Sequence, residues 1–145
     1  MDKFRRTLLG VVALGLLKPW AAFAAWNKEA FGASSTAEAL KGIGASGAAP
    51  SKEIVIEAPE IAENGAVVPI EITSNLAGTR SIAVLVDNNP FPLVGKFDFL
   101  EGAVPFVKLN VKMGETSEVR VVAQAGGRSY VASKEIKVTI GGCGG

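Results

Sequence analysis

Apolar and polar residues alternate along most of the chain from residue 51 onward. The clearest runs are residues 52–58, 67–73, 106–113, 118–125 and 135–140. Alternation with a period of two is typical of β-strands that bury one face. Residues 81–87 are instead almost continuously apolar, which predicts a central strand buried on both faces. Pro69 lacks a backbone N–H, so its strand is expected at a sheet edge or to carry a bulge.

Short turns separate these runs, and no helical pattern intervenes. Turn-forming residues lie at Glu63-Asn64-Gly65, residues 88–92 and Gly126-Gly127. With two weaker runs, residues 96–100 and 129–132, the set comes to about seven strands at regular spacing. The pattern predicts a mainly β fold, an antiparallel β-sandwich of immunoglobulin-like architecture. The Cys-Trp-Cys signature of true immunoglobulin domains is absent, because the chain has a single cysteine.

The segment before the sandwich is expected to be helical. Residues 25–41 are rich in Ala, Glu and Lys. Their apolar anchors are Trp26, Phe31 and Leu40. A Ser-Ser-Thr sequence interrupts the pattern, and Ser35 or Thr36 could cap a second piece. We therefore expect one broken helix or two short helices packed on the sandwich.

The first 24 residues have the features of an export signal. Residues 1–6 are basic, residues 7–17 are apolar, and Ala22-Phe23-Ala24 is an A-x-A cleavage site. The apolar run is too short to cross a bilayer as a helix, which takes about 20 residues. Arg5-Arg6 followed by Thr-Leu-Leu fits a twin-arginine signal. We therefore expect a periplasmic protein whose mature form starts at Ala25 and has no membrane segment.

Four regions follow from these patterns. They are a signal peptide (residues 1–24), an N-terminal helical segment and linker (25–50), a β-sandwich domain (51–140) and a flexible C-terminal arm (141–145). Small residues over 42–50 make the linker a flexible connector in this interpretation.

The polar residues offer few routes to catalysis. The chain has no histidine, which excludes Ser-His-Asp and Cys-His catalysis and imidazole metal sites. Its 15 basic and 14 acidic residues nearly balance, so a nucleic-acid-binding surface is not expected. Glu57, Glu60, Glu63 and Asp87 are interpreted as solvated surface charges. Met113 is interpreted as a core residue and Asn88-Asn89-Pro90 as a turn, so neither a metal site nor a cofactor is predicted.

Reactive chemistry is concentrated in the last five residues, Gly141-Gly142-Cys143-Gly144-Gly145. Cys143 is the only cysteine, so an internal disulfide is impossible and the thiol is left for reactive or intermolecular chemistry. Glycine lacks a Cβ, so the four glycines predict an open, flexible tether. The nearest basic residue is Lys137, and an unassisted thiol has a pKa of about 8.5. Cys143 is therefore expected to need activation by another protein.

The stretch Val138-Thr139-Ile140-Gly141-Gly142-Cys143-Gly144-Gly145 resembles the end of the SoxY family. That family comprises the sulfur-carrier subunits of the bacterial thiosulfate-oxidising Sox system. Weaker matches are Ala58-Pro59-Glu60-Ile61-Ala62-Glu63-Asn64-Gly65, Val68-Pro69, Asn89-Pro90 and Lys112-Met113. The resemblance implies a carrier rather than an enzyme, with Cys143 holding sulfur intermediates covalently while partner enzymes act on them.

The resemblance also implies particular partners. A SoxZ-like β-sandwich subunit would pair with this chain, and a SoxXA-type cytochrome c complex would couple thiosulfate to the thiol. A SoxB-type hydrolase would release sulfate, and in some organisms a sulfur dehydrogenase would oxidise the remaining sulfur.

Two other interpretations stay open. A Gly-Gly ending also occurs in ubiquitin-like carriers that form a thiocarboxylate, although that chemistry needs cytoplasmic adenylation with ATP. Alternatively, the chain is a structural periplasmic sandwich whose lone thiol forms an intermolecular disulfide. Replacing Cys143 by Ser separates these interpretations, because thiocarboxylate chemistry would survive the change.

Overall fold

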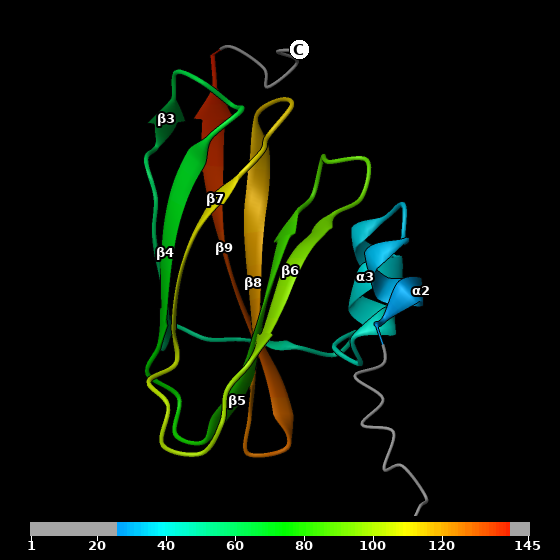
Figure 1. Cartoon of the computed structure of the whole chain (residues 1–145), viewed down its shortest axis with the longest axis vertical. Helices are drawn as coiled ribbons and strands as arrows, with labels where there is room; N and C mark the ends of the chain where they lie inside the picture. The colour runs from blue at the N-terminus through cyan, green and yellow to red at the C-terminus, as the bar shows by residue number, and fades with distance from the viewer. Residues whose placement is uncertain (1–25, 140–145) are drawn as a thin grey trace, which may run out of the picture.

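Alternating side chains produce two β-sheets that pack face to face (Figure 1). The computed structural model describes residues 26–139. The strands are β1 (Ala49–Pro50), β2 (Ile54–Glu57), β3 (Ile61–Ala62), β4 (Val68–Ser74), β5 (Thr79–Val86), β6 (Leu93–Asp98), β7 (Phe106–Val111), β8 (Ser117–Ala125) and β9 (Arg128–Val138). The larger sheet has the order β1-β9-β8-β5-β6, with β3 also paired to β9, and the smaller has the order β2-β4-β7. The fold is mainly β as predicted, and the strand order is compatible with an immunoglobulin-like sandwich.

The main core lies between the two sheets. In β4, Val68, Ile70 and Ile72 are fully buried, whereas the intervening residues face outward. From the larger sheet, alternate residues of β5 and β8 meet them, with Ile82 and Val121 among the members. Burying one such side chain stabilises the fold by about 1.5–3 kcal/mol, so this cluster is the main source of stability.

Strand β5 is buried on both faces, which confirms the prediction from its continuous apolar run. Its second face, with Ala83 and Leu85, packs under two short helices. These are α2 (Lys28–Phe31) and α3 (Thr36–Gly42). Ser35 caps α3, because its side chain accepts a hydrogen bond from the Glu38 backbone N–H at 3.2 Å.

Of the three predicted apolar anchors, Phe31 and Leu40 are partly buried and pack against the core under the helices, whereas Trp26 does not. Trp26 is 68% exposed and stacks on Phe31 with ring centroids 4.4 Å apart, so it is no core anchor. The buried positions are small, including Ala30 and Ala39. At Gly42 an added Cβ would lie 2.8 Å from Ala30, so the two helices approach too closely for larger side chains. The two helices contact each other by close approach of their backbones, which a pattern of bulky apolar residues in the sequence cannot reveal.

Pro69 was predicted at an edge or a bulge, yet β4 is the middle strand of its sheet. The hydrogen bond from Ser74 N to Pro105 O shows that even-numbered residues of β4 point their backbone groups toward β7. The nitrogen of Pro69 therefore faces the β2 side, where pairing ends at Glu71 opposite Glu57. A missing N–H costs no ladder hydrogen bond there.

The last strand is longer than its sequence pattern suggests. Two expected pieces, 129–132 and 135–140, form the single strand β9 up to Val138. Strands β1 and β3 pair with it in parallel, and β1 occupies the end of the segment expected as a flexible connector. Each of these strands has two residues, which is too short for any periodicity.

Candidate functional site

Cys143 and the predicted arm glycines lie outside the described residues. The structure describes the strand that leads to them, which ends with Val138 and is followed by Thr139. At this end of the sandwich, drawn uppermost in Figure 1, lie β3 and the loops β3–β4, β5–β6 and β7–β8. Residues 137–139, here called the arm root, are therefore the part of the site whose geometry can be described.

Strand β3 holds the arm root along one side. Ile61 pairs with Lys137 and Ala62 with Val138. The backbone N–H of Lys137 donates to Glu60 O at 2.9 Å, and that of Thr139 donates to Ala62 O at 3.1 Å. Two hydrogen bonds on alternate residues fix the direction in which the chain leaves the sandwich.

Thr116, from the β7–β8 loop, holds the other side of the arm root. Its Oγ1 accepts a hydrogen bond from the Val138 N–H at 3.0 Å. Val138 is thus contacted from the loop while its neighbours are contacted from β3. The root is anchored on two sides up to four residues before Cys143.

The loops at this end are cross-linked by hydrogen bonds. Asn88 Nδ2 donates to Thr116 O at 2.9 Å, and Asn89 Nδ2 donates to Lys112 O at 2.8 Å. The Met113 N–H donates to Gly65 O at 2.7 Å. Asn88 and Asn89 therefore brace the β5–β6 loop, which supports their interpretation as turn residues, and Met113 is fully buried as predicted. Sequence reasoning had no means of finding these contacts, although several of the weaker matches to SoxY fall on them.

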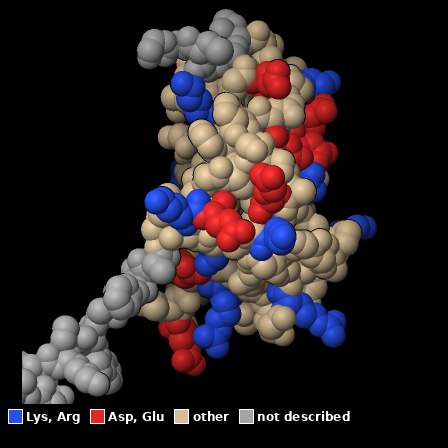
Figure 2. Space-filling model, turned by 90° about the vertical axis from the view of Figure 1, so that its right-hand side faces the viewer, with Lys and Arg blue, Asp and Glu red and all other residues tan. Residues whose placement is uncertain are grey.

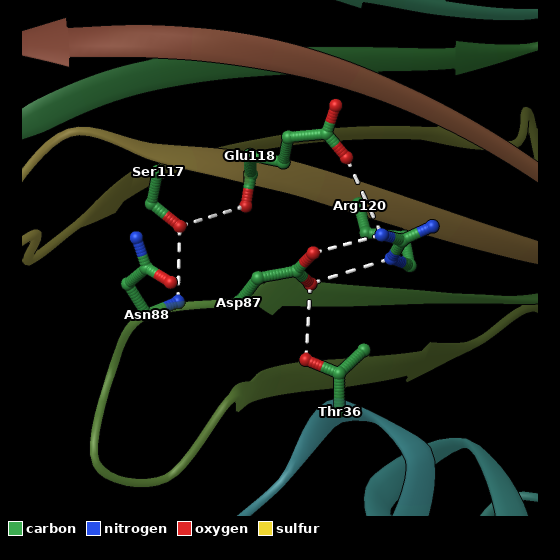
Figure 3. Close-up of polar contacts among 6 residues, drawn as sticks. All are labelled: Thr36, Asp87, Asn88, Ser117, Glu118 and Arg120. Atoms are coloured by element: carbon green, nitrogen blue, oxygen red, sulfur yellow. Dashed lines mark hydrogen bonds and ion pairs between the residues drawn. The ribbon is translucent and has the colours of Figure 1, made fainter.

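A polar cluster joins α3 to the larger sheet (Figure 3). Arg120 binds Asp87 through two hydrogen bonds, Nη2 to Oδ2 at 2.7 Å and Nε to Oδ1 at 3.3 Å. Thr36 Oγ1 donates to Asp87 Oδ1 at 3.1 Å, and Glu118 contacts the same guanidinium at 3.3 Å. The hydrogen bond that Arg120 donates to Asp87 raises the pKa of Arg120, and burial opposes this effect.

The prediction that Asp87 is a solvated surface charge is wrong. Its side chain is 23% exposed and that of Arg120 is 27% exposed. Residues Glu57, Glu60 and Glu63 are exposed as predicted. The pairing of Asp87 with Arg120 depends on the register between β5 and β8, which the sequence pattern does not give.

Replacing Asp87 by Ala should destabilise the fold by about 1–3 kcal/mol, because a partly buried guanidinium loses its main partner and Thr36 loses its acceptor. The measurement is urea unfolding, read as the free energy of unfolding at constant m-value. The matched control is Asp98→Ala, which removes an ion pair with Lys96 whose carboxylate is 73% exposed, and it should change stability by no more than about 0.5 kcal/mol. Equal effects of the two substitutions would show that the cluster is no structural anchor.

Within residues 26–139, no group of three or more His, Cys, Asp or Glu side chains is placed to hold a metal ion. In the same part of the chain, none of the helices is long and apolar enough to span a membrane.

Comparison with known proteins identifies the family. The family model described as sulfur oxidation protein SoxY matches residues 40–143. This chain belongs to the SoxY family. The solved structure of the sulfur carrier protein SoxY from Chlorobium limicola f thiosulfatophilum is similar, with 39% identity and a TM-score of 0.68. The match covers 79% of this chain and 100% of that one, and the family match runs to Cys143 itself.

A more distant likeness shows the fold alone. Superoxide reductase (neelaredoxin) from Ignicoccus hospitalis matches with 22% identity and a TM-score of 0.53, covering 59% of this chain and 79% of that one. No curated protein sequence matches this chain.

Proposed function

We propose that this protein carries sulfur intermediates of periplasmic thiosulfate oxidation as covalent adducts of Cys143. The observation that carries the proposal is a SoxY family match that runs to Cys143, the only thiol in the chain. The related structure from Chlorobium limicola f thiosulfatophilum is that of a sulfur carrier protein, which supports the same role. The export signal expected in residues 1–24 supports the periplasm as its location.

The proposed cycle begins with oxidative loading. The Cys143 thiol and the sulfane sulfur of thiosulfate form an S–S bond, giving Cys–S–S–SO₃⁻, one proton and two electrons. A SoxXA-type cytochrome c complex would accept the two electrons and pass them on. A SoxB-type hydrolase then adds water across the S–SO₃ bond, which releases sulfate and two protons and leaves a persulfide, Cys–S–S⁻.

The sulfane sulfur that remains is oxidised while still bound to Cys143. With three waters, the persulfide loses six electrons and six protons to become Cys–S–SO₃⁻, and a sulfur dehydrogenase takes the electrons in organisms that have one. A second hydrolysis releases sulfate and regenerates the thiolate. In this cycle the chain supplies the attachment atom and its presentation, whereas partner enzymes supply activation and electron transfer.

Transfer of labelled sulfur tests the proposal. The mature protein, with its companion subunit, is incubated with thiosulfate that carries sulfur-35 at the sulfane position and with periplasmic extract from thiosulfate-grown cells. Label should become protein-bound and be released by a thiol reductant. An extract that oxidises thiosulfate while leaving this protein unlabelled would contradict the carrier role. A structural sandwich linked by a disulfide would give that negative result and a reducible dimer.

A SoxZ-like β-sandwich subunit is proposed as the companion. On the outer face of the smaller sheet, the exposed side chains of Val55 and Phe106 flank Thr73 in register. Such a row on a sheet face is suited to being covered by another protein. Copurification from cells should give a heterodimer with a second small β protein. A monomer at micromolar concentration that is fully active with its enzymes would argue against obligatory pairing.

A further inference from the structure

We propose that Thr116 is a positioning residue for the chemistry of Cys143. Its hydrogen bond to Val138 keeps the arm root in place, so that the chain leaves the sandwich in one direction and presents the thiol to the partner enzymes. This inference rests on the proposed carrier function, and it adds a residue outside the arm on which the rate of sulfur loading depends. Thr116 acts through the arm root and not by contact with the sulfur.

The Thr116 side chain takes over where the backbone ladder between β8 and β9 ends. Within residues 26–139, this ladder has no pair beyond Ser117 opposite Ile136. The odd-numbered residues of the arm root direct their N–H groups to β3, so the N–H of Val138 points to the other side. There Thr116 Oγ1 accepts it at 3.0 Å. The side chain thereby extends the ladder by one step toward Cys143.

Thr116 is itself held in place by the β5–β6 loop. Its carbonyl oxygen accepts a hydrogen bond from Asn88 Nδ2 at 2.9 Å. The neighbouring Ser117 Oγ accepts one from the Asn88 N–H at 3.0 Å (Figure 3). Ser117 is 3% exposed, so this junction belongs to the packed part of the fold. A hydrogen-bonded connection therefore runs from the body of the sandwich to Val138 without passing along β9.

The bond to Val138 matters more for the position of the arm than for the stability of the fold. Thr116 is exposed, so in a variant without the hydroxyl water can bind the Val138 N–H and the fold loses little. The pairing on the other side of the arm root involves only the two residues of β3. Without the Thr116 oxygen, this short pairing has to hold the root, which then separates from the sandwich more often.

An anchored arm root restricts where the thiol can lie. Cys143 follows Thr139 by four residues, and a fully extended chain of that length spans at most about 14 Å. If the root separates as far back as Ile136, seven residues lead to the thiol and the maximal reach rises to roughly 25 Å. The concentration of the thiol at any one enzyme pocket then falls, and fewer of its orientations are productive.

The charge pattern of the helix-bearing face does not replace this anchoring. Figure 2 shows basic and acidic side chains interspersed on that face, without a field of one sign. A surface of this kind does not orient an approaching enzyme over a distance. The geometry of the arm root provides an orientation that this charge pattern does not.

The test replaces Thr116 in the full mature protein, studied with its companion subunit. Thr116→Val removes the hydroxyl with little change of shape, and Thr116→Ser keeps it. Ser51→Ala is the matched control, because Ser51 Oγ also accepts a backbone N–H, that of Glu53 at 3.1 Å, toward the end of the sandwich opposite the arm root. The readouts are the initial rate of sulfur-35 loading from thiosulfate in periplasmic extract, measured against carrier concentration, and amide hydrogen exchange of Val138 and Thr139.

The maximal rate of loading should fall by about fivefold in Thr116→Val, the effect of one hydrogen bond, while the carrier concentration for half-maximal loading stays within about twofold. Exchange of the Val138 and Thr139 amides should become about fivefold faster, although Thr116 bonds only to the first of them. Thr116→Ser and Ser51→Ala should stay within about twofold of the unchanged protein in every readout. Alkylation of Cys143 by iodoacetamide should be the same in all forms, because the substitutions alter no charge.

Three results would overturn the inference. A normal maximal rate for Thr116→Val would show that anchoring of the root does not position the thiol. Equal losses in Thr116→Val and Thr116→Ser would show that the hydroxyl is not the cause. A change confined to the concentration for half-maximal loading would indicate an enzyme contact rather than positioning. Absence of loading in the unchanged protein would instead refute the carrier function, and the exchange measurement would still decide whether Thr116 anchors Val138.

Discussion

Replacement of Cys143 by Ser should reduce protein-bound sulfur and thiosulfate oxidation by the reconstituted system to background. Serine differs from cysteine by one atom, but its oxygen forms neither a persulfide nor a thiosulfonate adduct. Because the chain has no second cysteine, no other side chain can take over the attachment. The measurement is sulfur-35 incorporation together with cytochrome c reduction driven by thiosulfate.

The same variant separates the competing interpretations. A carrier that uses a terminal thiocarboxylate would still bind sulfur after the substitution. A structural sandwich would lose a reducible dimer on gels without reductant, while thiosulfate oxidation would continue. The control is the free energy of unfolding of the Cys143→Ser variant. It should change by no more than about 0.5 kcal/mol, because the described core ends before residue 140.

Replacing Gly142 and Gly144 by Val should lower turnover of the reconstituted pathway by about 100-fold. Valine adds bulk on both sides of the thiol and disfavours positive φ, so the arm fits a narrow pocket less well and a small misplacement of the sulfur is costly. Turnover is measured as the rate of sulfate release per carrier.

Two comparisons decide what a loss of turnover means. Alkylation of Cys143 by a small reagent should be nearly unchanged, because the substitutions alter no charge. Gly47→Val is the matched control in the described part of the chain, since no atom lies within 4 Å of an added Cβ there, and its turnover should be normal. Full turnover of the Gly142 and Gly144 variant would show that the glycines are not needed for pocket entry.

The strand pattern was largely predictable because side-chain alternation reports directly on which face of a strand is buried. The continuous apolar run of β5 likewise predicted a strand buried on both faces, and capping preferences narrowed the start of α3 to Ser35 or Thr36, of which the structure shows Ser35. Features that depend on how the strands pair could not be predicted. The ion pair of Asp87 with Arg120 and the place of Pro69 in a middle strand follow from strand register, which local patterns do not encode.

The candidate site also has one part that the sequence predicts and one part that it does not. Cys143 and its glycines stand out in the sequence because their composition suits no packed element. The anchoring of the arm root is invisible there, because β3 has two residues and Thr116 looks like any turn residue. Only the fold brings residues 60–62 and 116 to the strand that leads to the cysteine.

The most direct test of the carrier role is the intact mass of the protein isolated from cells oxidising thiosulfate, recorded before and after treatment with a thiol reductant. The account predicts a set of species heavier than the mature chain by sulfur, sulfonate or thiosulfonate groups, which collapse to the unmodified mass on reduction. Fragmentation should place every added mass on Cys143. A single unmodified mass in such cells, under rapid acid quenching, would contradict the account.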